Sequence, residues 1–412
     1  MSIGPATYEN LAMPLVEQGE DLSGELLSLI RRSAETLAEA PEEEPRIRDR
    51  VEQQIEEKVQ DFQANANSWP DEELAAAYQR GFESANGDLE AAVDNPRDEG
   101  NDITAGQVMT AGMAATVSQQ AQRTEDGVVI PPSLLARLRP KGRKFFSENP
   151  QHYNFYATFR QAARDDIEGM MRPIIRETRD MYRDVAIQSG TQRFRAESVT
   201  RRRDMSQDMV RRFANRGITG VMYRDGRRMP VEEYSEMVGR TMSGRCSVQA
   251  ELNRLHERGY DLIRMSVHAG ASPLCEPWQG GVYSQTGQSD RYPPWADAVA
   301  GGAFHPQCIH HISPYIPGRS PSRSDIERRH PAEAAMIREH GEARGNRMIY
   351  EATQEQRRIE RGIRKWKRRQ STAMTDREAR RAQNKIREWQ GRQRQHTEQF
   401  RFLRRKYERE QI

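Results

Sequence analysis

The chain has 412 residues, of which 35% are hydrophobic and 30% are charged. This length can bury the cores of two or three domains. The low apolar and high charged fractions favour long helices with solvated faces, or surfaces that partners cover. No apolar run is long enough to span a bilayer, and the N-terminus lacks a signal pattern. We therefore expect synthesis in the cytosol, where three cysteines stay reduced and a disulfide framework is excluded.

The net charge of +3 hides a strong gradient along the chain. Residues 1–130 carry a net charge of −18, residues 131–318 carry +8, and residues 319–412 carry +13. Such polarity indicates either that the two ends face different partners or that they pair with each other or with neighbouring subunits.

The first 125 residues read as acidic helices. One apolar face is formed by Leu22, Leu26, Leu27 and Ile30, and a break is expected at residues 40–45, which contain two prolines. The next apolar face repeats at steps of three and four residues, as helices do, and comprises Val51, Ile55, Val59 and Phe62. Trp69-Pro70-Asp71-Glu72 is typical of a helix start, and residues 104–122 predict a further helix of small and Met side chains.

Residues 133–260 predict a central helical body. Residues 152–216 read as two long helices with a break or kink near Pro173. Their expected inward side chains are Phe155, Phe159, Ile167, Met171, Ile174, Ile175, Met181 and Val185. Asp225-Gly226 predicts a hairpin with a two-residue type I′ turn. A helix over about 231–258 should end at Gly259, and residues 261–267 alternate like a strand.

Residues 261–318 form an island rich in Cys, His and Trp. Between His268 and Gly318 lie four of the nine histidines, two of the three cysteines and two of the five tryptophans. Pro, Gly and aromatic residues at this density exclude one regular element and predict a small, irregular structure held by specific side chains.

The island predicts a metal site. On a strand, Cys308 and His310 would share one face, and thiolate and imidazole are ligands that zinc prefers. Cys275 and His268 are the natural second pair of a Cys₂His₂ tetrahedron. The spacing departs from the usual zinc-finger patterns, so the alternative is a buried Cys among His side chains that bind the backbone. A Cys–His nucleophile pair is disfavoured because no third group orients the His.

A second motif in the island is better explained by structure than by ligand binding. In Trp278-Gln279-Gly280, Trp can anchor a core, Gln can bridge backbone groups, and Gly allows a tight turn. The segment from Tyr292 to Trp295 is either an exposed aromatic plug for a neighbour or a packed loop.

The C-terminal arm, residues 319–412, is basic and helical. Thr375 and Glu378 fit a capping box, and Ala382, Ile386, Trp389, Phe400, Leu403 and Tyr407 form a narrow apolar stripe, as in a helical hairpin or coiled coil. A cluster of cations can neutralise DNA phosphates without reading sequence, namely Arg364, Lys365, Lys367, Arg368 and Arg369. The alternative is a solvated helix with intrahelical pairs such as Glu360–Arg364.

The ordered motifs of the island also carry a family resemblance. They are the strand end at residues 266–271, Trp278-Gln279-Gly280, Cys308-Ile309-His310 and the segment from Pro314 through Tyr315 to Gly318. Together with residues 350–364 and a last helix that includes residues 403–410, this pattern resembles the minor capsid (minor head) proteins of tailed bacteriophages. The resemblance covers roughly residues 200–412.

These features predict a mainly α fold with a small β-containing, loop-rich island and a long C-terminal helical arm. We divide the chain into regions 1–125, 133–260, 261–318 and 319–412. The resemblance implies a structural virion protein, present in several copies and not an enzyme. It would assemble in the host cytoplasm with portal and capsid proteins, without a membrane, and contact packaged double-stranded DNA. The alternatives are a packaged metal-dependent nuclease or toxin-like effector built on the island, and a non-viral DNA-binding scaffold.

Overall fold

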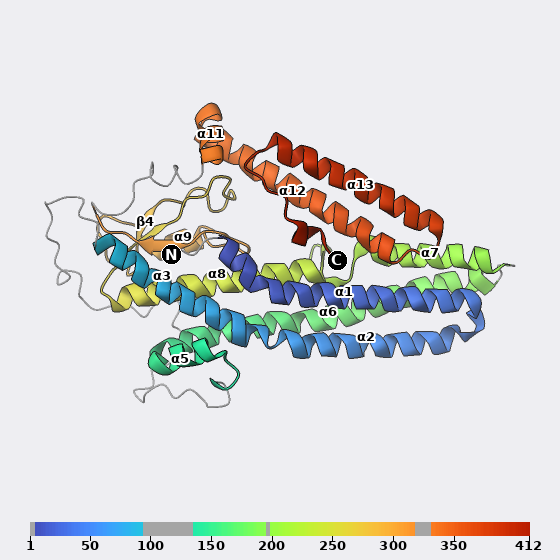
Figure 1. Cartoon of the computed structure of the whole chain (residues 1–412). Coiled ribbons are helices and arrows are strands. Elements are labelled where there is room, and N and C mark those ends of the chain that lie inside the picture. Colours follow the sequence, from blue (N-terminus) through green and yellow to red (C-terminus); the bar gives the residue numbers. More distant parts are fainter. Residues whose placement is uncertain (1–4, 94–134, 195–197, 318–330) are drawn as a thin grey trace. The chain divides into compact units, whose positions relative to one another are not determined.

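The computed structural model describes residues 5–93, 135–194, 198–317 and 331–412, and it is mainly helical (Figure 1). This confirms the predicted fold class. None of the described helices is long and apolar enough to cross a bilayer. The principal helices are α1 (Pro5–Glu39), α2 (Glu44–Ala66), α3 (Ala75–Val93), α5 (Pro140–Glu148), α6 (Tyr153–Phe194), α7 (Val199–Arg216), α8 (Val231–Glu257), α9 (Trp295–Ala300), α11 (Pro331–His340), α12 (Glu342–Ser371) and α13 (Asp376–Gln399).

The strands and the single-turn helices are short. The strands β1 (Thr219–Met222) and β2 (Arg228–Pro230) form an antiparallel hairpin, and β4 (Val282–Ser284), β3 (Leu262–Met265) and β5 (Ile312–Pro314) form an antiparallel sheet in that order. The single turns are η1 (Pro41–Glu43), the π-helical η2 (Pro70–Leu74), η3 (Pro150–His152) and η4 (Tyr407–Glu410). The predicted helix at residues 104–122 lies outside the described residues.

The chain divides into two compact units, each built from three stretches of sequence. The first unit contains Met1–Met13, Ser68–Arg164 and Met237–Tyr350. The second contains Pro14–Asn67, Asp165–Glu236 and Glu351–Ile412. Four of the five boundaries fall inside α1, α6, α8 and α12, and the fifth lies between Asn67 and Ser68, after the end of α2. The predicted four-region division describes sequence character along the chain and stays a prediction.

In the second unit, the helical periodicity of the N-terminal region predicted the buried faces correctly. Leu26, Ile30 and Ile55 are fully buried, and α1 ends before Pro41 as expected. The polar edges of the two helices also meet, because Lys58 Nζ lies 2.9 Å from Glu25 Oε2.

The predicted helices over residues 152–216 are α6 and α7, but their details differ from expectation. Helix α6 continues through Pro173 instead of breaking there. Ile167 and Ile174 are buried as predicted, whereas Phe155, at the start of the helix in the first unit, is 37% exposed. The neighbouring Tyr156 is buried in its place, with its hydroxyl donating to Pro70 O at 3.0 Å.

The predicted hairpin is confirmed, but its turn is not type I′. Gly226 N donates to Tyr223 O, and Gly226 has φ 82°, while Asp225 has no positive φ. Asp225 instead accepts hydrogen bonds from the backbone and side chain of Arg227. The next predicted element is also confirmed, since α8 ends at Glu257 and Gly259 adopts φ 78°.

The C-terminal arm folds as a helical hairpin in which α12 and α13 lie side by side in opposite directions (Figure 1). Gly362 lies against the indole of Trp389, where an added Cβ would come within 2.7 Å of the ring. Thr375 caps α13 by accepting from Glu378 N. The predicted apolar stripe does not continue through a last helix, because α13 ends at Gln399 and Tyr407 is 62% exposed in η4.

In the first unit, the three-stranded sheet closes a core against α3 and α8. Ile263 and Met265 of β3 are fully buried, together with side chains from both helices such as Leu89 and Leu255. Helices α3 and α8 approach closely at Gly81, where a Cβ would lie 2.2 Å from Ser247 O. This packing holds the sheet in place, and the loops that leave the sheet carry the island residues.

Candidate functional site

The candidate site lies in two loops beside the three-stranded sheet. One loop joins β3 to β4 and carries Cys275, and the other precedes β5 and carries Cys308. Cys308 and His310 were predicted on a strand, but β5 begins only at Ile312. The two loops are joined by two hydrogen bonds, because Ser266 N donates to His311 O at 2.9 Å and His311 N donates to Ser266 Oγ at 3.1 Å.

The two island cysteines meet across these loops. Their Sγ atoms are 3.6 Å apart, and Cys308 Sγ is 3.3 Å from Nδ1 of His310. Cys275 is fully buried and His310 is 2% exposed. The structure therefore brings together three of the four residues that the sequence predicted as zinc ligands.

The second histidine beside the sulfur atoms is His305, which the sequence pattern did not single out. Its ligand atom and the Sγ atoms of Cys275 and Cys308 lie within 4.8 Å of one another. His268 instead packs its ring edge-on against His310, with centroids 4.9 Å apart, and its Nε2 lies 3.0 Å from Ser266 Oγ. His305 could have been found from His305-Pro306-Gln307-Cys308, a spacing that places a second imidazole near the thiol.

Each imidazole near the sulfur atoms is held through its other ring nitrogen. Nδ1 of His305 lies 2.7 Å from Pro306 O, and Nε2 of His310 lies 3.2 Å from Gln279 Oε1. A carbonyl oxygen can only accept, so each contact requires a proton on that nitrogen. The opposite nitrogen, Nε2 of His305 or Nδ1 of His310, carries a lone pair when the ring is neutral and a proton when the ring is an imidazolium. Nε2 of His305 also contacts Ser272 Oγ at 2.7 Å.

The electrostatics of this cluster favour a thiolate at Cys275. Hydrogen bonds from Cys308, and then from His305 and His310, hold the pKa of Cys275 well below its usual range. The same interaction with Cys275 raises the pKa of His305. The pKa of the Cys308 thiol is raised by its contact with Cys275 and by burial. A buried thiolate is stable only where cations or strong hydrogen-bond donors surround it.

The Trp278-Gln279-Gly280 motif supports the loop from within. Trp278 Nε1 donates to Gly301 O at 3.3 Å, and its own carbonyl accepts from Tyr283 at 2.6 Å. Gln279 Oε1 accepts from His268 N at 2.9 Å in addition to its contact with His310. Gly280 turns the chain at φ 74°. These contacts favour the structural interpretation of the motif.

The other aromatic residues of the island also pack into it. The ring of Tyr315 lies under the Arg264 guanidinium at 4.7 Å. Trp295 packs edge-on against Tyr283 and Phe304, with centroids 5.6 and 5.1 Å apart. The segment from Tyr292 to Trp295 therefore contributes to a packed loop at Trp295, not to an exposed plug.

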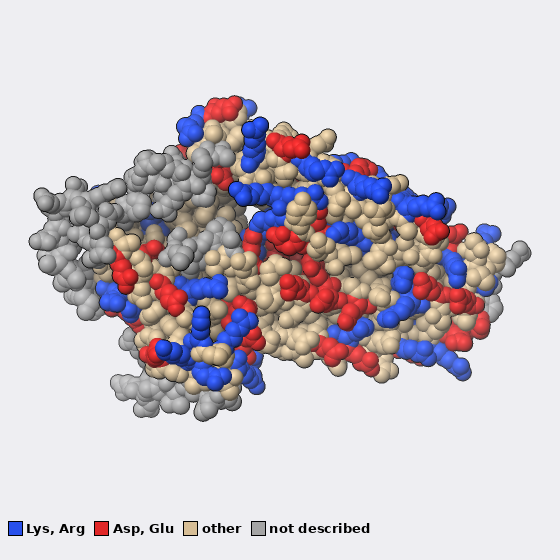
Figure 2. Space-filling view, viewed as in Figure 1, with Lys and Arg blue, Asp and Glu red and all other residues tan. Residues whose placement is uncertain are grey.

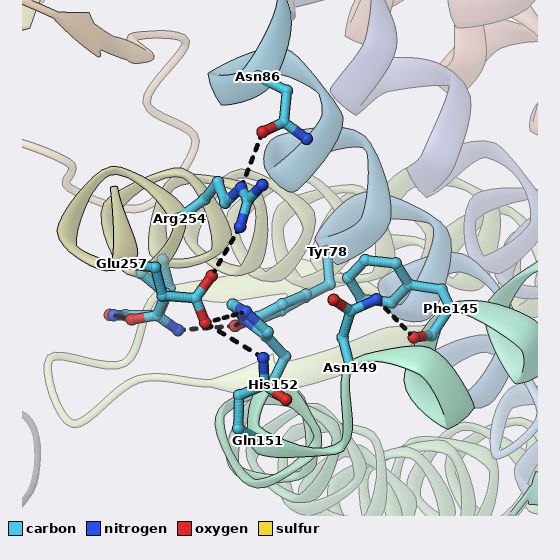
Figure 3. A network of polar contacts seen from close by, with 10 residues as sticks. Tyr78, Asn86, Phe145, Asn149, Gln151, His152, Arg254 and Glu257 are labelled. Carbon is cyan, nitrogen blue, oxygen red and sulfur yellow. Dashed lines mark hydrogen bonds and ion pairs between the residues drawn. The ribbon is translucent and has the colours of Figure 1, made fainter. Parts of the chain in front are cut away.

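A second polar cluster in the first unit surrounds His152 (Figure 3). Its Nδ1 lies 2.9 Å from the Tyr78 hydroxyl and its Nε2 lies 2.8 Å from Glu257 Oε1. Arg254 links Glu257 to Asn86. His152 is 1% exposed, and burial lowers its pKa. The cluster joins α3, η3 and α8 through polar contacts within the core, so we interpret its role as structural.

The predicted DNA-binding cations of α12 divide into two groups. Arg364, Arg368 and Arg369 are buried in the second unit and paired with carboxylates. Arg364 contacts Glu233 at 3.0 Å, Arg368 contacts Glu232 at 2.8 Å, and Arg369 pairs with Glu378. Arginines held in this way have no free guanidinium face for phosphate, so this arrangement offers no support for their DNA contact.

The remaining two predicted cations lie nearer to solvent. Lys365 and Lys367 are half-buried, and Lys367 Nζ donates to Gln411 Oε1 at 2.7 Å. Figure 2 shows Lys and Arg side chains along the helical hairpin. On α13 the exposed arginines that form no ion pair with a described residue are Arg380, Arg381, Arg387 and Arg394.

Comparison with known proteins identifies the family. No curated protein and no solved structure matches the chain. A family model described as phage minor capsid protein 2 matches residues 120–398, which include the island and both arm helices. The match supports a structural role in the virion and gives no support to the packaged-enzyme alternative. The chain belongs to the phage minor capsid protein 2 family.

Proposed function

We propose that this minor capsid protein acts in head assembly near the portal and contacts the packaged DNA without sequence specificity. The family match carries the assembly part of the proposal. The long helices and highly charged surface suit a protein that is covered by partners in the assembled head, in several copies per virion.

The assembly role is tested by co-expression with the portal and capsid proteins of the same genome. The protein is expected to co-purify with heads or portal at fewer copies than the major capsid protein. A variant in which the basic side chains of α13 are neutralised provides a control. It should still co-purify with heads or portal, because it removes the proposed DNA contacts and leaves the assembly contacts in place. Absence of the protein from purified virions would rule out the assembly role.

The outer face of α13 is the best candidate for the DNA contact. Arg380, Arg387 and Arg394 are spaced by seven residues, or about two helical turns, so they project from one side at intervals of about 10 Å. Arg381 lies beside this row. Each exposed guanidinium can neutralise a phosphate and release a condensed counterion, and no base contact is needed. We therefore propose the exposed arginines of α13, in place of the buried arginines of α12, as the residues that contact DNA.

The DNA contact is tested by replacing all four α13 arginines with Gln. The slope of log K against log salt for duplex DNA binding by the full chain is expected to flatten by up to about three to four units, at about 0.9 for each phosphate that is no longer neutralised. Stability is expected to change little, because exposed substitutions usually cost under about 0.5 kcal/mol each. A charge-matched control replaces four exposed arginines elsewhere in the second unit, namely Arg32, Arg172, Arg201 and Arg224.

The two variants distinguish a defined surface from general attraction. If both variants reduce the salt slope equally, the protein attracts DNA through its overall charge, and the assignment to α13 is wrong. If neither variant changes binding, the arm faces protein or solvent, and the DNA proposal fails while the capsid assignment stands.

A further inference from the structure

We propose that Cys275, Cys308, His305 and His310 form a structural zinc site that closes the two island loops against each other. The proposal concerns the internal architecture of the first unit. It does not depend on a role at the portal or on DNA binding.

The distances suit a zinc tetrahedron. Two sulfur atoms bound to one zinc ion at about 2.3 Å stand about 3.8 Å apart, and a sulfur and a nitrogen stand about 3.6 Å apart. The observed separations are 3.6 Å between the cysteine sulfur atoms and 3.3 Å between Cys308 Sγ and His310 Nδ1. The third neighbour is His305, since its ligand atom and the two sulfur atoms lie within 4.8 Å of one another.

The surroundings of the two imidazoles also suit metal ligands. In zinc sites the histidine nitrogen remote from the metal usually donates to a carbonyl or carboxylate oxygen, which orients the ring. Pro306 O fills this role for His305, and Gln279 Oε1 fills it for His310. In His310 the opposite nitrogen, Nδ1, lies 3.3 Å from Cys308 Sγ and can bind a metal ion when the ring is neutral.

The loop that precedes β5 adopts an unusual backbone conformation at this site. Phe304 has φ 57° and Gln307 has φ 64°, although neither is glycine. Non-glycine residues keep this left-handed backbone conformation only where surrounding contacts hold them, at a cost of order 1–3 kcal/mol each. They flank His305 and precede Cys308, so ligation at these two positions would supply the restraint.

The donor set indicates zinc in a structural role. Two thiolates and two imidazoles are a soft, four-ligand set that tetrahedral Zn²⁺ prefers. The four protein ligands complete the tetrahedron, so no position remains open for water or substrate. The proposed site is still of the Cys₂His₂ type that the sequence predicted, but His305 takes the place of His268 as a ligand.

The test measures zinc in the full-length protein purified under reducing conditions, followed by titration of metal-depleted protein with Zn²⁺ and with Co²⁺. We expect about one zinc per chain. The Co²⁺ form should show the visible absorption of a tetrahedral site and thiolate-to-metal charge transfer. Because metal binding is coupled to folding, chelation should lower the melting temperature.

Four single variants identify the ligands. Cys308→Ser and His305→Gln are expected to abolish stoichiometric zinc and to lose the cobalt spectrum. Cys246→Ser removes the third thiol, which is buried in α8 and donates to Leu74 O, and is expected to retain both. His268→Gln is expected to retain zinc as well, because its ring packs on His310 outside the ligand set.

Three outcomes would overturn the proposal. The first is depleted wild-type protein that binds neither Zn²⁺ nor Co²⁺ at one per chain. The second is a Cys275–Cys308 disulfide in wild-type protein prepared separately without a reductant. The third is loss of zinc in His268→Gln with retention in His305→Gln. Because the first two measurements use the unmodified chain, they decide the proposal even if a variant fails to fold.

Discussion

The buried pair of Arg368 and Glu232 allows a direct test of the role of the arm arginines. The two side chains are 7% and 6% exposed, and Arg368 Nη1 lies 2.8 Å from Glu232 Oε1. Arg368 Nε also donates to Ala214 O at 3.3 Å. Replacing Arg368 with Met keeps most of the volume but leaves the carboxylate without its principal cation. Removing one partner of a buried pair costs about 3–5 kcal/mol of stability.

The cost of Arg368→Met should depend on pH. Burial raises the pKa of Glu232, and Arg368 opposes this rise. In the variant the folded-state pKa rises further, so the folded protein binds a proton that the unfolded chain releases above about pH 4.5. Parent and variant lose stability in parallel as pH rises from about 4.5 to the raised pKa of Glu232 in the parent. Above that pKa the stability of the variant relative to the parent should fall by about 1.4 kcal/mol per pH unit until the higher pKa of the variant is reached.

Urea unfolding at pH 5 and pH 8 measures this effect in the single variants Arg368→Met and Glu232→Gln and in the double variant. The double variant should recover more than half of the stability difference at pH 8, because replacing both members of a buried pair is often nearly neutral. Arg381→Gln is the exposed control and should change stability by under about 0.5 kcal/mol. If Arg368→Met is as harmless as this control at pH 8, or costs the same at both pH values, the buried-pair argument is refuted.

Two further predictions concern a buried carboxyl and a close helix contact. Burial raises the pKa of Glu360 to about 7, so the parent loses stability as pH rises from about 4.5 through 7. Glu360→Gln should gain up to about 3 kcal/mol over the parent in urea unfolding at pH 8 and almost nothing at pH 4.5. Gly81→Ala should lower the melting temperature, because its Cβ would overlap Ser247 O and shifting this backbone contact costs at least about 1–3 kcal/mol. The matched control is Gly24→Ala in α1, where the Cβ meets nothing within 4 Å, so stability should rise by up to about 1 kcal/mol. An equal drop in stability in both glycine variants, or a Glu360→Gln gain that does not change with pH, would contradict these expectations.

The local elements of this protein were predictable from its sequence because they depend on neighbouring residues. Helical spacing placed Leu26, Ile30 and Ile55 on buried faces, and Gly259 marked the end of α8. Thr375 capped α13 as its position predicted. Side-chain periodicity, turn geometry and capping act over a few residues, so these features are present in the linear pattern.

Only the tertiary structure decided which polar residues are buried. Arg368 reads in the sequence as one cation of an exposed basic cluster, yet it pairs with Glu232, a residue more than a hundred positions away. Periodicity along α12 does not reveal this, because burial of a charge depends on whether a distant helix supplies the opposite charge. The exposed row of arginines on α13 became distinguishable from the buried ones for the same reason.

The island shows the same division. Composition concentrated the Cys and His residues, and the choice of Cys275, Cys308 and His310 as neighbours follows from residue type. Residue type does not show that His305, and not His268, lies beside the cysteines. Both histidines lie in irregular loops, where no regular side-chain periodicity predicts which way a residue points. The path of those loops is set by the sheet order β4-β3-β5 and by the left-handed residues Phe304 and Gln307. Contacts between distant segments therefore determined which imidazole faces the thiols.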